Sequence, residues 1–142
     1  MTETELENIS NDFIKYFENS YQVDSEGIIQ KKDKAPYVWA TDRIHDFTIK
    51  SPEKLFPIIL AILEKDPSNE VLEVLAAGPL EDYLATNNED FIAKVERQAK
   101  IDPKFASLLG GVWQNAMTDE TWERVQKVWD RSGWDGITKE SP

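Results

Sequence analysis

The stretch from Leu72 to Leu84, read L-E-V-L-A-A-G-P-L-E-D-Y-L, decides the fold that we predict. Its apolar residues recur at intervals of three and four, which is the spacing of a buried helix stripe. Gly78 suits a helix C-terminus because glycine adopts positive φ without steric cost. Pro79 suits the first position of a following helix, where no backbone N–H is needed. We therefore predict that one helix ends at Gly78 and another begins at Pro79.

The acidic pair after this turn has two interpretations. Glu81 and Asp82 fall in the first turn of the second predicted helix. The helix dipole stabilises a carboxylate there by roughly 0.3–1 kcal/mol. Alternatively, the pair binds a cation or a basic partner.

Working outward, we find the same short apolar stripes between Gly and Pro residues on both sides. They predict an all-α fold, with about six to seven short helices in a single domain over residues 1–142. Pro57 conflicts with an unbroken helix from Pro52, so either a short turn precedes a second start or the helix is kinked. Side-chain caps are expected at Asn88, Asp102 and Thr118. Residues 20–35 are predicted to form a long loop, or a loop with one brief extended piece, and residues 133–142 a C-terminal tail.

Two copies of the dipeptide Asp-Pro indicate an internal repeat. They occur at Asp66-Pro67 and Asp102-Pro103, and each precedes a short helix that ends in a small-residue turn. Paired helices that recur at the distance between these two copies are typical of a short HEAT or tetratricopeptide (TPR) stack. An irregular helical bundle is the alternative.

Composition excludes several classes of function. The formal net charge of −11 disfavours nucleic acid and anionic membranes as partners, because their phosphates repel the protein. The absence of cysteine excludes disulfides and zinc–thiolate sites. The acidic N-terminus does not resemble a signal peptide, and the longest apolar run, Phe56 to Leu63, is too short to cross a bilayer. We therefore expect a cytoplasmic protein.

The strongest electrostatic feature is local. Seven acids and no Lys or Arg lie between Asp66 and Asp90. One interpretation is a set of solvated helix starts; the other is an acidic face that attracts a basic protein. An exposed tryptophan would supply an anchor for such a partner. The predicted partner-binding residues are Asp66, Glu70, Glu73, Glu81, Asp82, Glu89, Asp90 and Trp39.

Several short sequence motifs also resemble those of a known family. They are Trp39-Ala40, Ser51-Pro52-Glu53, A-A-G-P-L-E-D-Y-L from Ala76 to Leu84, Asp102-Pro103-x-Phe105, and L-L-G-G-V-W from Leu108 to Trp113. In this order they are similar to an uncharacterised family of small bacterial proteins with a Gly-Pro-Leu-Glu motif. The resemblance covers roughly Trp39 to Val128 and implies a small helical protein of bacterial origin. It implies no activity.

The sequence offers little catalytic chemistry. His45, the one histidine, has Asp42 and Asp46 nearby and could form an acid–base pair with either. No phosphate-binding loop, metal-ligand motif or nucleophile elbow occurs, so no cofactor or metal is expected.

We therefore predict a non-enzymatic, acidic protein-binding protein. Its most plausible form is an immunity or inhibitor protein that occludes a basic bacterial toxin. The alternatives are a helical scaffold or adaptor that binds a peptide, and a hydrolase-type enzyme that uses His45.

Overall fold

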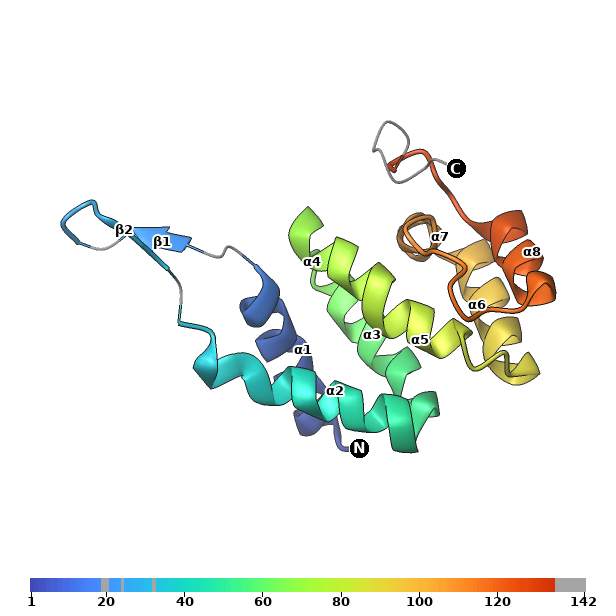
Figure 1. Ribbon diagram of the computed structural model, residues 1–142, viewed down its shortest axis with the longest axis horizontal. Helices are drawn as coiled ribbons and strands as arrows, with labels where there is room; N and C mark the ends of the chain where they lie inside the picture. Colours follow the sequence, from blue (N-terminus) through green and yellow to red (C-terminus); the bar gives the residue numbers. More distant parts are fainter. Residues whose placement is uncertain (19–20, 24, 32, 135–142) are drawn as a thin grey trace. The chain divides into compact units, whose positions relative to one another are not determined.

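The computed structural model describes residues 1–18, 21–23, 25–31 and 33–134 (Figure 1). The chain divides into two compact units, Met1–Val74 and Leu75–Pro142, which we call the N-terminal unit and the C-terminal unit. The predicted all-α class is confirmed. The sheet found in the described ranges consists of two short strands.

The N-terminal unit is built around three packed helices. Thr2 caps the first of them by accepting the backbone N–H of Glu5, and Ile9 and Phe13 form its buried side. This helix packs against the two that follow it. The elements of this unit are α1 (Glu3–Phe17), η1 (Ala35–Tyr37), α2 (Val38–Lys50), η2 (Pro52–Lys54), α3 (Leu55–Glu64) and most of α4 (Asn69–Leu75).

Pro57 lies in the first turn of α3, because the short helix η2 precedes a new helix start at Leu55. The first backbone N–H groups of an α-helix have no acceptor within the helix, so a proline there removes no hydrogen bond. Of the two alternatives for this segment, the short turn before a second start is the one observed.

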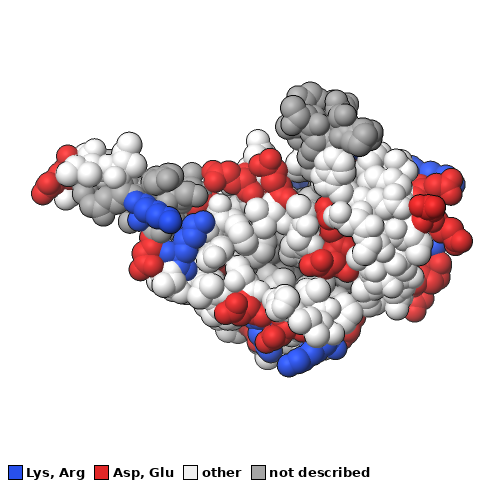
Figure 2. All heavy atoms as spheres, in the orientation of Figure 1, with Lys and Arg blue, Asp and Glu red and all other residues white. Residues whose placement is uncertain are grey.

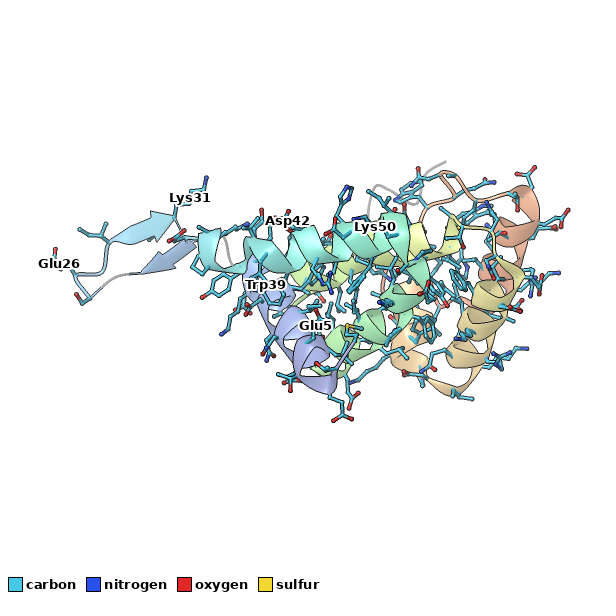
Figure 3. All side chains as sticks on the ribbon, turned by 90° about the horizontal axis from the view of Figure 1, so that it is seen from below. Glu5, Glu26, Lys31, Trp39, Asp42 and Lys50 are labelled. Atoms are coloured by element: carbon cyan, nitrogen blue, oxygen red, sulfur yellow. The ribbon has the colours of Figure 1, made fainter. Side chains whose placement is uncertain are left out.

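A β-hairpin occupies much of the segment predicted as a long loop. Strands β1 (Tyr21–Val23) and β2 (Ile29–Lys31) pair antiparallel, and Gly27 takes a positive φ of 80° in the turn. Strands of three residues are too short to show the alternation by which a strand is recognised in sequence. In Figures 1 and 3 the hairpin projects away from α1 and α2.

The C-terminal unit contains the remaining helices, and the three predicted caps are confirmed there. Asn88 accepts the N–H groups of Asp90 and Phe91, Asp102 accepts that of Lys104, and Thr118 that of Thr121. The helices are α5 (Glu81–Leu84), α6 (Glu89–Ile101), α7 (Pro103–Leu109) and α8 (Asp119–Val128).

The predicted break between Gly78 and Pro79 is wrong. Residues 69–84 are helical without interruption, because a π-helical turn, η3 (Ala76–Leu80), joins α4 to α5. The N–H of Glu81 donates to the carbonyl of Ala76, five residues earlier. This wider turn relieves the clash that the ring of Pro79 would make in a regular α-helix. Gly78 does not adopt positive φ.

The two Asp-Pro copies have different local structures. Asp102 has φ −131° and caps α7, whereas Asp66 has φ 50° and lies before α4. The two copies of the dipeptide therefore differ in backbone conformation, and they do not by themselves support a repeat.

The pair Gly110-Gly111 ends α7 as predicted, but close packing is the reason. A Cβ at Gly111 would lie 2.5 Å from the ring of Trp134, and one at Gly110 would collide with the carbonyl oxygen of Asp130. The indole N–H of Trp134 donates to the carbonyl of Ser107 at 2.7 Å. Glycine is needed here because the chain that follows α8 folds back against α7.

Candidate functional site

Glu81 differs most from its predicted role. Its side chain is only 6% exposed. Oε2 accepts the backbone N–H of Trp113 at 2.9 Å, and Oε1 accepts the side-chain amide of Asn115. The carboxylate therefore fastens the start of α5 to the loop after α7, and we remove Glu81 from the candidate binding surface.

The other predicted acids are exposed but divided between the units. Three of them, Asp66, Glu70 and Glu73, lie in the N-terminal unit, before and within α4. In the C-terminal unit, Asp82 lies on α5, and Glu89 and Asp90 begin α6. Each unit thus contributes its own negative surface, and no single element carries the whole set.

Glu89 is already engaged by a cation. Arg124 of α8 contacts Glu89 at 2.7 Å and Glu96 at 2.6 Å. Its guanidinium holds the pKa of both carboxyl groups below the ordinary value, mainly through the hydrogen bonds that it donates. These three side chains join α6 to α8, so we assign them a structural role.

The outer face of α2 is the most distinctive surface of the N-terminal unit. Ala40, Ile44 and Phe47 turn inward, which leaves the opposite side of the helix to solvent. We call this side the α2 face, and it carries three exposed apolar side chains and three exposed polar ones. They are Val38, Trp39, Asp42, His45, Asp46 and Ile49.

Trp39 is the exposed member of the five tryptophans, at 39%. Its indole N–H donates to Asp12 of α1 at 2.7 Å, so the ring is held by one edge while part of it meets solvent (Figure 3). A fixed, half-exposed indole loses little conformational freedom when a partner covers it. Ile49 near the other end of the helix is 66% exposed.

Two of the cations close to this face, Arg43 and Lys54, contact partners within the unit. Arg43 contacts Glu5 at 3.1 Å and lies over the ring of Phe47, which Lys54 also covers. Asp42 and Asp46 therefore leave the α2 face acidic. Figure 2 shows Asp and Glu side chains over α2 with Lys or Arg side chains beside them, and a second group of acids at the end formed by α6 and α8.

The catalytic alternative gains no support from the geometry. No hydrogen bond or ion pair joins His45 to Asp42 or Asp46 in the described part of the chain. Within the same part, no cluster of His, Cys, Asp and Glu could hold a metal ion. Among the described residues, no helix combines the length and apolar character needed to cross a bilayer.

Comparison with protein families gives a match over most of the chain. Residues 28–133 match a family described as a family of unknown function (DUF6869). The chain belongs to this family. The matched residues of this DUF6869 chain include β2, the α2 face and the Glu81 contacts. No curated protein and no solved structure matches the chain.

Sequence reasoning found part of the α2 face. Trp39 was among the predicted residues, and Asp42 and Asp46 were considered only as partners of His45. Val38 and Ile49 were missed. Both lie off the stripe formed by Ala40, Ile44 and Phe47, and a β-branched residue off the buried stripe was the signal that could have found them.

Proposed function

We propose that this DUF6869 protein is a non-enzymatic binding protein that holds a basic protein partner against the α2 face. The observation that carries the proposal is the exposure of Trp39 beside Val38 and Asp42 on one helix surface. An exposed aromatic anchor beside a polar rim is typical of a protein interface.

The chemistry of this face indicates the chemistry of the partner. Asp42 and Asp46 attract Lys or Arg side chains, while Val38, Trp39 and Ile49 cover apolar surface between them. The overall charge of −11 increases the association rate with a basic protein at low salt. Asp66, Glu70 and Glu73 contribute to this long-range field from the same unit.

The most specific form of the proposal is a bacterial, cytoplasmic immunity or inhibitor protein. Its acidic α2 face would cover the cationic substrate site of a toxin and exclude the substrate. This form is supported by the acidity of the chain and by the exposed apolar and acidic side chains of the α2 face.

Affinity capture from cells that naturally make the protein tests the proposal. Tagged wild-type protein is compared with Trp39→Ala and Asp42→Lys, and Glu64→Lys on α3 serves as the matched control. The bound protein is identified by mass spectrometry, purified, and titrated by calorimetry. Loss of Trp39 from an interface centre is expected to weaken binding about 30-fold, while the control binds as wild type. Equal binding by all four proteins, or an acidic partner, would refute the proposal.

A further inference from the structure

The second half of α6 carries a cluster of cations in an otherwise acidic chain. Lys94, Arg97 and Lys100 are exposed and lie within seven consecutive residues. Ile101, which follows them, is 78% exposed, the highest value among the exposed large hydrophobic side chains of the described residues. Residues three and four apart share a helix face, so Lys94, Arg97 and Ile101 form one line on the outside of α6. We call these four residues the α6 basic surface.

The acids closest to this surface in the sequence are already occupied. Both carboxylate oxygens of Glu96 accept hydrogen bonds from Arg124, at 2.9 Å and 2.6 Å. Asp102 accepts the backbone N–H of Lys104 with one oxygen and the side-chain amide of Gln98 with the other. Because other donors hold these carboxylates, they are not the contact partners of the cations on the outer line of α6.

The cations of the α6 basic surface make no side-chain contact of their own. In the part of the chain that the structure describes, no hydrogen bond or ion pair joins Lys94, Arg97 or Lys100 to an acid. The helix dipole favours a cation in the last turn of α6 and accounts for Lys100. It does not account for Lys94 in the middle of the helix, nor for the exposed Ile101 beside the cations.

This arrangement indicates the chemistry of a ligand. The guanidinium of Arg97 can hold a carboxylate with two hydrogen bonds, and each lysine can pair with another. The line from Lys94 to Ile101 is about 10 Å long, which is two helical turns. A short acidic segment with one bulky apolar side chain therefore has a partner for every member of the surface.

A polyphosphate fits the same surface less well. A DNA duplex carries one negative charge per about 1.7 Å of its axis and extends far beyond three cations. Glu89 and Asp90 begin the same helix, and the whole chain has a net charge of −11, so a long anion meets repulsion on either side. A short segment can be selected by close contact alone.

We propose that the α6 basic surface binds an acidic segment of another protein. Carboxylates of the segment pair with the three cations, and an apolar side chain covers Ile101. The α6 basic surface lies in the C-terminal unit, whereas the α2 face lies in the N-terminal unit and has the opposite charge. The inference thus goes beyond the proposed function and does not depend on it.

A fluorescently labelled synthetic peptide tests this proposal. The peptide has about 12 residues, with Glu at every third or fourth position and Leu between them, so that it presents about three helical turns. In a matched peptide every Glu is replaced by Gln. Each peptide is titrated with the full chain, and the fluorescence anisotropy is measured.

Two variants and one control are compared with wild type, and circular dichroism confirms that each is folded. Arg97→Glu reverses the central charge of the surface, and Ile101→Ser removes its apolar side chain. Lys31→Glu is the matched control, because it changes the net charge equally at an exposed position of β2 in the N-terminal unit.

Wild-type protein is expected to bind the Glu peptide with a Kd of about 100 µM. The Gln peptide should bind about tenfold more weakly. Arg97→Glu should weaken binding of the Glu peptide by about tenfold or more, because it sets like charges against each other. Ile101→Ser should weaken it about fivefold. The Lys31→Glu control should bind as wild type.

Three results would overturn the inference: no binding of the Glu peptide, equal binding of the two peptides, or an Arg97→Glu variant that binds as wild type. A single-stranded oligonucleotide and vesicles of phosphatidylcholine and phosphatidylserine are tested beside the peptide. If either binds more tightly than the peptide and is lost in Arg97→Glu, the surface takes phosphate and the proposal is wrong. The proposed function fails separately, because its capture experiment concerns Trp39 and Asp42.

Discussion

Glu81 accepts a 2.9 Å hydrogen bond from the backbone N–H of Trp113, a residue 32 positions further along the chain. The same carboxylate accepts the side-chain amide of Asn115, whose backbone takes a positive φ of 42°. One buried acid thus fixes a loop that contains no regular structure. The Gly-Pro-Leu-Glu sequence places that acid directly after the π turn.

Replacing Glu81 is expected to destabilise the protein. Glu81→Ala leaves two part-buried hydrogen bonds without their acceptor and should lower the free energy of unfolding by about 2–3 kcal/mol. Glu81→Gln retains one acceptor oxygen and should cost about 1–2 kcal/mol. Urea denaturation measures both. Glu120→Ala, on the exposed start of α8, is the control and should change little. Equal stability of Glu81→Ala and wild type would contradict the assigned contacts.

Alanine at two glycines should have opposite effects. At Gly78 no atom lies within 4 Å of an added Cβ, and the backbone is helical. Gly78→Ala should therefore stabilise the protein by about 0.5–1 kcal/mol. At Gly111 the added Cβ meets the ring of Trp134, so Gly111→Ala should cost about 1–3 kcal/mol. Thermal unfolding would show the two effects as opposite shifts of the melting temperature.

The Gly111 cost can be traced to its cause by a double-mutant cycle. In a Trp134→Ala background the ring is gone, and the penalty of Gly111→Ala should shrink. A penalty that is unchanged in that background would show that the ring is not responsible.

The contribution of Arg124 should depend on pH. Hydrogen bonds from Arg124 lower the pKa of Glu89 and Glu96 in the folded protein. Carboxyl groups with a depressed pKa stabilise the fold above their unfolded pKa, and this contribution is lost as the pH falls through the folded pKa. Arg124→Met should thus be less stable than wild type at neutral pH, with a difference that shrinks as the pH falls below about 4 and vanishes below the folded pKa of both carboxyl groups. Denaturation curves at several pH values measure it, and a difference that persists at low pH would point to lost packing instead.

Tyr83 should ionise late in an alkaline titration. Burial raises its pKa to about 12, and its ring stacks on Phe91 at 4.5 Å. In the unfolded chain a tyrosine ionises at about pH 10. The unfolded state therefore binds fewer protons between these two values, and stability should fall as the pH rises from 10 to 12. Tyrosinate absorbance should show a late step that Tyr83→Phe removes.

Local signals predicted much of this fold. The capping residues Asn88, Asp102 and Thr118 set helix starts because a side-chain oxygen satisfies backbone donors within the next three residues. For Pro57 the sequence left two alternatives, and the one with a short turn before a second helix start is observed. The pair Gly78-Pro79 led to a wrong prediction, because glycine is typical of a helix C-terminus and proline of a helix start. Only tertiary packing selects the π turn. The hairpin was missed because three-residue strands carry too little pattern.

The sequence predicts what kind of site the candidate site is, but not where on the surface it lies. Net charge indicated an acidic binding surface, and Trp39 was recognised as a possible anchor. Whether an acid is exposed depends on contacts between residues that are distant in sequence. Glu81 is buried because the loop at Trp113 covers it, and nothing near Glu81 in the sequence indicates that loop.

The five residues of η3 also determine the direction in which the later side chains point around the helix axis. A π turn holds one residue more than an α turn, so every side chain after it points about 100° away from where an unbroken α-helix would place it. Deleting Ala77 would remove that offset. If Ala76 kept its buried position, Glu81 would turn away from Trp113, and the loop would lose the carboxylate that fastens it. The length of this short segment thus matters as much as its composition.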